Sequence, residues 1–380
     1  MKGKSEIGVV RTSFKENERR VPIHPEHLGW IPESVRNQLV FETDYGLPFG
    51  LENRELATRV GGIASREEIL ADCDVVLLLK PVEADFRQLR TNGVLVGWVH
   101  CVQQRRNTQA AIDRRLTLIA LESMHLWDKA GERQMHVFSK SNELAGYAGV
   151  IHTMHIIGLD GYYGEMRKVL VISYGSVSRG AIFALQARGF TDITVFTQRD
   201  PNFVRDQEFN ARYRQLITGP DGRLYSTSLD GSARPFLEDL SSADIIVNGI
   251  LQDTDRPLMF LSENEVPCLK PGSIIIDISC DEGMGFPFAL PTTFDDPVFR
   301  VGKSTYYSVD HTPAYLWNSA SWEISKCLLP FLERITMGPD RWEKDETIRR
   351  AIEIEGGVIR NPKILSFQRR SDQYPHDSSL

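Results

Sequence analysis

The chain has 380 residues, of which 41% are hydrophobic and 25% are charged, and its formal net charge at pH 7 is −7. This length favours two domains, and the composition is typical of a globular protein rather than a disordered one. The acidic balance argues against a nucleic-acid or anionic-membrane partner, because both bind a basic face. It still allows a local basic pocket for a small anion.

Apolar runs and cysteines indicate the compartment. Each apolar run is shorter than a membrane-spanning helix requires, and the N-terminus lacks the apolar core of a signal peptide. The five cysteines are scattered, odd in number and never spaced as CxxC. This pattern predicts reduced thiols in a cytoplasmic protein, with no disulfide framework and no metal site.

The first third of the chain alternates short apolar runs with helix-like stretches. Four runs rich in branched residues predict buried strands: Ile7–Val10, Asp74–Leu79, Gly93–Val99 and Thr117–Leu121. Two stretches, Pro25–Ile31 and Ser65–Ala71, predict helices, the second with Ser65 as its N-cap. The alternation predicts an α/β fold with a mostly parallel sheet and helices on both faces.

A long helix is expected over Asn142–Leu159. Glycine weakens a helix, so Gly146 and Gly149 indicate close packing against another backbone. His152 and His155 lie one turn apart, but no acidic or thiol ligand accompanies them. We therefore interpret them as a structural pair rather than metal ligands.

A second strand–helix series follows, including a helix that ends at Arg188. Its predicted strands are Lys168–Ser173, Asp192–Thr197, Asp244–Asn248 and Ser273–Ile278. Between them, the polar stretch Arg199–Leu240 is expected to be the least ordered part, with a turn at its Gly-Pro-Asp-Gly. An apolar helix is predicted over Trp317–Arg334. The charged chain beyond it is expected to be frayed from Arg369.

The strand ending at Ser173 runs directly into a turn, Tyr174-Gly175-Ser176-Val177-Ser178-Arg179-Gly180, and then a helix. A dinucleotide site needs this order: a tight turn, a small residue beside the pyrophosphate, and free N–H groups at a helix N-terminus. Gly175 fills the second role, Ser178 the third, and Gly180 favours close helix–strand packing. Ser173 stands where the first glycine is usual, so the fingerprint is degenerate and weak by itself.

The residue that closes the next strand bears on the choice of nucleotide. An NAD site prefers an acidic residue there, about 20 residues after the turn, to bind the ribose 2′-hydroxyl. This chain has Thr197-Gln198-Arg199 instead. A guanidinium suits a 2′-phosphate, so Arg199 favours NADPH over NADH, the alternative being a solvated loop arginine.

Polar residues at strand ends predict a substrate site. Lys80 and His100 each end an apolar strand, and Asp281 follows another, where the ligand sites of α/β proteins lie. Asp277, inside the strand, is interpreted as structural. Arg20, in Asn-Glu-Arg-Arg-Val-Pro after the first strand, could bind a carboxylate bidentately, although a solvated basic pair explains it equally well.

Five segments together resemble one family. They are N-E-R-R-V-P around Arg20, L-K-P at Leu79–Pro81, G-W-V-H at Gly97–His100, A-G-Y-A-G-V at Ala145–Val150 and I-D-I-S-C-D at Ile276–Asp281. The set resembles the alanine dehydrogenase and saccharopine dehydrogenase superfamily over about residues 5–335. Within it the chain is most similar to the opine-type N5-(carboxyethyl)ornithine synthases.

The resemblance implies two Rossmann-like doubly wound domains with the active site in the cleft between them. The expected substrate domain is residues 1–140 plus 312–380, and the expected NADP-binding domain is residues 141–311. The implied reaction is the NADPH-dependent reductive condensation of a 2-oxo acid, pyruvate, with the side-chain amine of ornithine or lysine. A homo-oligomer is the expectation for such an enzyme.

The resemblance also implies residue roles. Arg20 is the expected substrate-carboxylate arginine, and Lys80, His100 and Asp281 are the expected catalytic residues. The expected cofactor-binding residues are Ser173, Gly175, Ser176, Val177, Ser178, Arg199, Asn248, Gly249 and His311. Two alternatives stay open: an alanine or saccharopine dehydrogenase, or a catalytically silent NADP-binding module.

Overall fold

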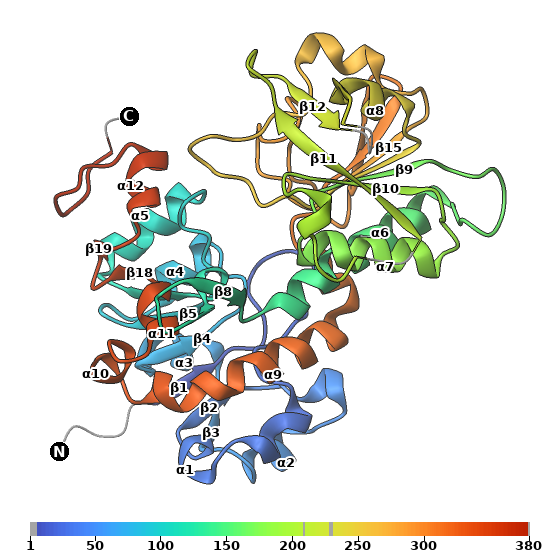
Figure 1. Cartoon of the computed structure of the whole chain (residues 1–380). Helices are drawn as coiled ribbons and strands as arrows, with labels where there is room; N and C mark the ends of the chain where they lie inside the picture. The colour runs from blue at the N-terminus through green and yellow to red at the C-terminus, as the bar shows by residue number, and fades with distance from the viewer. Residues whose placement is uncertain (1–5, 208–209, 228–230, 379–380) are drawn as a thin grey trace. The chain divides into compact units, whose positions relative to one another are not determined.

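The computed structural model describes residues 6–207, 210–227 and 231–378, and the chain divides into two compact units. Unit 1 comprises Met1–Ser139 and Trp317–Leu380, and unit 2 comprises Lys140–Leu316. Each unit is built on its own sheet, and most strand pairs in both sheets are parallel (Figure 1). The predicted α/β class with two Rossmann-like sheets is confirmed.

The sheet of unit 1 has the strand order β19-β18-β6-β5-β4-β1-β2-β3 over the described residues. Its strands are β1 Ile7–Val9, β2 Leu39–Glu42, β3 Gly62–Ala64, β4 Val75–Leu77, β5 Val94–Gly97, β6 Thr117–Ala120, β18 Ile352–Glu355 and β19 Val358–Ile359. The first six are mutually parallel, whereas β18 runs antiparallel to β6 and β19 antiparallel to β18. A separate hairpin joins β7 His125–Trp127 to β8 Arg133–His136.

Helices lie between and after these strands in the sequence. They are η1 Pro25–Trp30, α1 Glu33–Arg36, η2 Leu47–Phe49, α2 Asn53–Ala57, α3 Arg66–Asp72, α4 Glu83–Gln88, α5 Arg105–Asp113, η3 Leu121–Ser123, α9 Trp317–Thr336, α10 Pro339–Trp342, α11 Glu346–Ala351 and α12 Pro362–Gln368. Apolar side chains of α3, α4, α5 and α12 pack with those of the strands in one core. Ser65 caps α3 as predicted, in a capping box with Glu68. The helix expected at Pro25–Ile31 is a 3₁₀ helix.

The expectation of a frayed end beyond Arg369 is wrong. The chain after α9 returns to the sheet as β18 and β19 and then forms α12 (Figure 1). His376 is buried, and its Nε2 accepts a hydrogen bond from the backbone N–H of Ile359 at 3.0 Å. We did not predict this segment because it is attached by His376 and by polar contacts such as that of Arg370 Nη1 with Gln109 Oε1 at 2.9 Å, not by an apolar run.

The sheet of unit 2 has the strand order β13-β12-β11-β10-β9-β14-β15-β17-β16 over the described residues. Its strands are β9 Val169–Ile172, β10 Ile193–Thr197, β11 Ala211–Thr218, β12 Leu224–Thr227, β13 Ala233–Pro235, β14 Ile245–Asn248, β15 Ile274–Asp277, β16 Val298–Val301 and β17 Ser304–Tyr307. Alternate residues of β9 point to opposite faces: Val169 and Val171 join one core, Leu170 and Ile172 the other. Both faces of this sheet are therefore buried, which explains its continuous apolar strands.

Helices cover both faces of this sheet. They are α6 Ser139–Ile157, α7 Ser176–Ala187, η4 Pro201–Phe203, α8 Phe236–Ser242, η5 Glu263–Cys268 and η6 Thr312–Leu316. A Cβ on Gly146 of α6 would lie 1.8 Å from the Val177 carbonyl oxygen, and one on Gly180 of α7 would lie 1.7 Å from that of Glu143. The close packing predicted for Gly146 is thus confirmed. Gly180 serves the same helix–helix contact, not the helix–strand packing expected of it.

We expected the polar stretch Arg199–Leu240 to be the least ordered part, but its described residues form regular secondary structure, and residues 208–209 and 228–230 within it lie outside the described residues. It forms η4, the three strands β11–β13 and most of α8, and it extends the sheet beyond β10. We did not predict β11 as a strand because two of its alternate residues are the arginines Arg212 and Arg214. The apolar pattern could not reveal a strand whose side chains on one face are charged.

Other expectations concern single side chains. His152 is buried, with Nδ1 3.0 Å from the Tyr307 hydroxyl, so its interpretation as a structural histidine agrees with its contacts.

All five cysteines are free thiols. Within the described ranges, no helix is long and apolar enough to cross a membrane. No group of His, Cys, Asp or Glu among those same residues is arranged to hold a metal ion.

Candidate functional site

The carboxyl edge of the unit 1 sheet carries the polar residues predicted there and one more. Strands β4, β5 and β6 are adjacent and parallel, so the residues after them meet at one edge. These residues include Lys80 after β4, His100 after β5 and Glu122 after β6, in η3. Lys80 and His100 are both partly exposed and thus accessible to a ligand.

Lys80 and His100 are in direct contact, with Lys80 Nζ 3.1 Å from His100 Nε2. His100 has a φ of 46°, in the left-handed region that non-glycine residues rarely adopt. Such strain is typical of functional sites that the surrounding fold holds in place. The approach of the two strands requires Gly97, because a Cβ there would lie 2.0 Å from the Leu78 carbonyl oxygen.

Glu122 is the neighbour of this pair that the sequence analysis missed. The backbone N–H of His100 donates to Glu122 Oε1 at 2.6 Å, and His100 Nδ1 lies 4.0 Å from the same oxygen. Burial, followed by repulsion from Glu353, raises the pKa of Glu122 to about 8. A signal was present, because Glu122 follows a predicted strand just as Lys80 and His100 do.

Glu353 of β18, in the C-terminal segment, is the second carboxyl whose charge acts on Glu122. Its Oε1 accepts hydrogen bonds from Ser123 Oγ at 2.9 Å and Asn361 Nδ2 at 3.2 Å. Oε2 of each glutamate is buried without a hydrogen-bond partner among the described residues. Burial raises the pKa of Glu353 as well. Because two buried carboxylates repel each other, protonation of at least one of them is favoured.

Arg20 is buried and already has a carboxylate partner. Its Nε donates to Glu18 Oε1 at 2.8 Å and its Nη2 to Glu18 Oε2 at 2.5 Å. The guanidinium carbon lies 6.0 Å from the ring centroid of Trp98, two residues before His100. Arg20 is therefore fixed in orientation, whereas the adjacent Arg19 is exposed and lies over the Trp317 ring.

In unit 2, the predicted residues also share one sheet edge. Strands β10, β9, β14, β15 and β17 are consecutive and parallel. Residues just past their carboxyl ends are Arg199, Ser173, Gly249, Asp281 and His311. The cofactor set and Asp281 thus belong to this unit, while Arg20, Lys80 and His100 belong to the other.

The turn after β9 has the geometry that a dinucleotide pyrophosphate requires. Ser173 has a φ of 77°, which explains why glycine is usual at this position. Gly175 is the N-cap of α7 and provides no side-chain cap, so the N–H groups of Ser176 and Val177 are available to an anion. A Cβ on Gly175 would lie 4.0 Å from its nearest neighbour, Ser173 Oγ, so the turn is open. These residues fit a nicotinamide dinucleotide.

Two further predicted residues complete the turn. Ser178 is buried, and its Oγ donates to the Ile172 carbonyl oxygen at 3.1 Å, which fixes the start of α7 on β9. Gly249 approaches Ser178 closely, because a Cβ on Gly249 would lie 2.5 Å from Ser178 Oγ and 3.1 Å from its backbone nitrogen. Arg199 is exposed and its Nη2 donates to the Tyr174 carbonyl oxygen at 3.0 Å, so its guanidinium lies beside the turn.

The Tyr174 side chain points away from the turn into the core. Its ring packs edge-on against Tyr213 at 5.1 Å, and its hydroxyl donates to the Asp206 carbonyl oxygen. The guanidinium of Arg179 lies 5.2 Å from the same ring, and it also bonds the Asp206 carbonyl at 3.3 Å. Arg179 is a second cation near the turn that the sequence analysis did not assign.

Asn248 is fully buried and its amide is used within the protein. Nδ2 donates to Asp277 Oδ1 at 2.9 Å, and Tyr306 donates to Asp277 Oδ2 at 2.7 Å. Burial raises the pKa of Asp277 to about 7. These contacts agree with the interpretation of Asp277 as structural, and the Asn248 side-chain oxygen Oδ1 also accepts the backbone N–H of Ile250 at 3.3 Å.

Asp281 and His311 lie on the loops after β15 and β17. Asp281 is partly exposed, and its backbone N–H bonds the Ser279 carbonyl at 2.7 Å. His311 is buried, its Nδ1 lies 2.8 Å from Asp310 Oδ1, and its ring meets Phe294 edge-on at 4.9 Å. Asp281 can thus reach a ligand more readily than His311.

Comparison with known proteins identifies the family. The model for the alanine dehydrogenase/PNT N-terminal domain matches residues 8–145, and that for the C-terminal domain matches residues 143–362. The chain belongs to this family. The resemblance seen in the sequence is therefore confirmed.

The similar proteins carry different names. The chain is 25% identical over 332 residues to an N(5)-(carboxyethyl)ornithine synthase of Lactococcus lactis subsp. lactis, covering 85% of this chain and 93% of that protein. It is also 25% identical to an alanine dehydrogenase of Mycobacterium tuberculosis, covering 85% of each. A solved L-alanine dehydrogenase has a TM-score of 0.71 at 18% identity, covering 95% of this chain and 98% of that one. A transhydrogenase from Sinorhizobium meliloti has a TM-score of 0.70 at 19% identity, covering 94% and 99%.

Proposed function

We propose that this protein is an NADPH-dependent oxidoreductase that condenses a 2-oxo acid, pyruvate, with the side-chain amine of an amino acid such as ornithine or lysine. The observation that carries the proposal is the contact between Lys80 and His100 at the carboxyl edge of unit 1. An ammonium beside an imidazole supplies both an electrostatic partner for a carbonyl and a group that exchanges protons near neutral pH.

Each residue of unit 1 has a distinct task in this proposal. Lys80 polarises the 2-oxo carbonyl and stabilises the negative charge that develops on its oxygen. His100 accepts the proton of the attacking amine and returns a proton to the carbinolamine oxygen, which leaves as water. Arg20 binds the substrate carboxylate through Nη1, since Glu18 occupies Nε and Nη2.

Glu122 positions His100 in this scheme. Its Oε1 accepts the backbone N–H of His100 and so holds the strained conformation of that residue. Because its pKa is raised to about 8, the carboxyl is largely protonated at neutral pH and adds little negative charge beside the Lys80–His100 pair.

Unit 2 would hold the cofactor. The open N–H groups of Ser176 and Val177 would bind the pyrophosphate, and Arg199 would bind the 2′-phosphate. When bound, NADPH supplies the hydride that reduces the imine. Asp281 is the proposed partner of the attacking amine.

The names of the similar proteins support both an opine-type enzyme and a rival. N(5)-(carboxyethyl)ornithine synthases favour the condensation, whereas alanine dehydrogenases of equal identity favour ammonia as the amine. Saccharopine dehydrogenase chemistry, with 2-oxoglutarate and lysine, is a further variant. Lys80, His100 and Asp281 together argue against a silent nucleotide-binding module.

The test is to follow NADPH oxidation with pyruvate and a panel of amines that includes ammonia, ornithine and lysine. We expect turnover with ornithine or lysine well above that with ammonia, and a product whose mass equals the amine plus pyruvate, less one oxygen. Turnover with ammonia alone would overturn the opine assignment. No turnover with any pair, 2-oxoglutarate with lysine included, would favour the silent module.

A further inference from the structure

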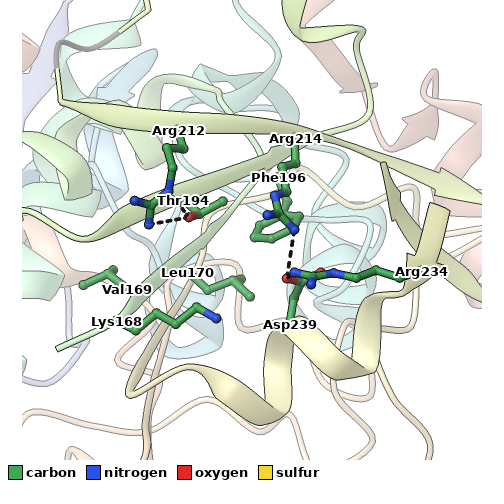
Figure 2. A pocket seen from close by; sticks show the side chains of 9 residues that line it. All are labelled: Lys168, Val169, Leu170, Thr194, Phe196, Arg212, Arg214, Arg234 and Asp239. Carbon is green, nitrogen blue, oxygen red and sulfur yellow. Dashed lines mark hydrogen bonds and ion pairs between the residues drawn. The ribbon is translucent and has the colours of Figure 1, made fainter. Parts of the chain in front are cut away.

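A basic cavity lies in unit 2 at the opposite edge of the sheet from the nucleotide turn. Its volume is about 250 Å³, and it opens between the starts of β9, β10 and β11 and helix α8 (Figure 2). Lys168 precedes β9 and Arg212 lies near the start of β11, whereas Ser173 and Arg199 follow the other ends of β9 and β10. The cavity is therefore distinct from the candidate cofactor site.

Cations dominate its lining. Lys168, Arg212, Arg214 and Arg234 line the cavity together with one carboxylate, Asp239. A second carboxylate, Asp192, pairs with Arg212 outside the lining. Four positive and two negative side chains leave a formal charge of +2 among the described residues. In a protein whose net charge is −7, this concentration of cations calls for a ligand of opposite charge.

Asp239 holds two of these guanidiniums in place. It is 2% exposed, and its Oδ2 accepts a hydrogen bond from Ser226 Oγ at 2.5 Å. Arg234 forms an ion pair with it, and Arg214 Nη1 lies 3.5 Å from its Oδ1 (Figure 2). A buried carboxylate of this kind fixes arginines before a ligand arrives, which lowers the entropic cost of binding.

Several N–H groups of the cavity have no hydrogen-bond partner among the residues that the structure describes. A guanidinium carries five N–H donors, and among the described residues Arg214 uses one, on Asp239. Lys168 donates to a neutral hydroxyl, Ser242 Oγ, at 2.5 Å. Arg212 uses Nε and Nη2 on Thr194 and Asp192, and it keeps Nη1. The unused donors suit an anion with several acceptor oxygens.

The floor of the cavity is apolar and its size is modest. Leu170 and Phe196 form part of the lining beneath the arginines (Figure 2). A volume of about 250 Å³ lies just below the range of drug-sized pockets. It suits a compact ligand that presents an anion to the arginines and a few carbons to the floor.

We propose that this cavity is a second anion-binding site, selective for a small phosphate-bearing molecule. A phosphate dianion matches the formal charge of +2, and its oxygens match the fixed guanidinium forks. The apolar floor favours a phosphate monoester with a short carbon chain over free phosphate. The site lies outside the machinery that the proposed function uses, so its failure leaves that function unaffected.

Calorimetric titration of the whole protein at constant ionic strength tests the proposal. The probes are glycerol 3-phosphate, inorganic phosphate, sulfate and succinate. We expect one saturable site for glycerol 3-phosphate, weaker binding of inorganic phosphate, and the weakest binding of sulfate and succinate. The double variant Lys168→Gln/Arg212→Gln should weaken glycerol 3-phosphate about tenfold or more, because charge-assisted bonds are lost.

Two matched variants separate this site from other causes. Lys303→Gln removes one charge from an exposed position of the same unit and should leave binding unchanged. Gly175→Asp adds a carboxylate to the nucleotide turn, where space exists for it, and should also leave binding unchanged. Loss of binding in Gly175→Asp but not in the double variant would mean that phosphate occupies the turn, which would overturn the proposal. The absence of saturable binding to any probe would do the same.

Discussion

The carboxyl edges of the two sheets have the same topology but serve different purposes. In unit 1, the strand ends present side chains that can exchange protons or carry charge, namely Lys80, His100 and Glu122. In unit 2, the central feature is backbone: the uncapped N-terminus of α7 after Gly175. The first edge is suited to chemistry and the second to binding.

The two edges share one backbone feature. Each has a non-glycine residue with a left-handed φ within three residues of a strand end, 46° at His100 and 77° at Ser173. At His100 the strain fixes an imidazole against Lys80, and Glu122 holds it there. At Ser173 the strain only turns the backbone toward α7, and glycine could do the same. Four predictions test this difference.

The largest effect is expected for His100→Ala. Loss of the acid/base group should lower kcat about 10³-fold, while the affinity for NADPH stays nearly constant because the nucleotide turn is in unit 2. Steady-state kinetics and a fluorescence titration of NADPH measure the two quantities. His155→Ala, which alters an exposed histidine of α6, serves as the control. A fully active His100→Ala enzyme would refute the acid/base role.

Arg199→Asp tests nucleotide binding at the carboxyl edge of the unit 2 sheet. Replacing the guanidinium with a carboxylate should weaken NADPH by about 10–100-fold and NADH much less, because one charge-assisted interaction with the 2′-phosphate is lost. Dissociation constants for both nucleotides measure this. The control, Arg205→Asp, changes the same charge at an exposed position of the unit. Equal losses for the two nucleotides would remove the argument for NADPH.

Glu122→Gln should change how stability depends on pH. The folded protein raises the pKa of Glu122 from 4.5 to about 8, so the stability contribution of its proton is complete below pH 4.5 and is lost as the pH rises toward 8. The free energy of unfolding should fall by at most about 1.4 kcal/mol per pH unit over this range. Urea titrations of Glu122→Gln should give a flatter profile, and those of the exposed-site control Glu52→Gln should not. Parallel profiles for wild type and Glu122→Gln would contradict the raised pKa.

Ser173→Gly should have the smallest effect, a gain in stability of about 0.5–1 kcal/mol. Glycine adopts a φ of 77° without a Cβ clash, and part of this gain is offset by its greater freedom in the unfolded chain. Ser176→Gly, in the first turn of α7, should lower stability instead. Thermal unfolding measures both, and a loss for Ser173→Gly would show that the serine hydroxyl matters more than the strain.

Much of the fold could be predicted from local patterns. Apolar runs located the central strands of both sheets, and Ser65 with Glu68 located the start of α3, because these signals depend on residues near in sequence. The strand β11 and the chain beyond α9 escaped prediction. Arg212 and Arg214 of β11 face the cavity, and the chain beyond α9 joins the core through separated residues such as Ile354 and Ile364, so neither segment contains a continuous apolar run.

Strand-end reasoning predicted that Lys80 and His100 lie at one sheet edge, since parallel strands present their carboxyl ends together. It assigned no partner for either residue. Three features depend on the tertiary structure: the contact between them, the repulsion of Glu122 by Glu353 from the far end of the chain, and the basic cavity made by β9, β10, β11 and α8. The sequence by itself determined which residues could do chemistry, because that depends on side-chain type and position along a strand. Only the tertiary structure decided which of them touch, because contacts across hundreds of residues depend on strand order and packing.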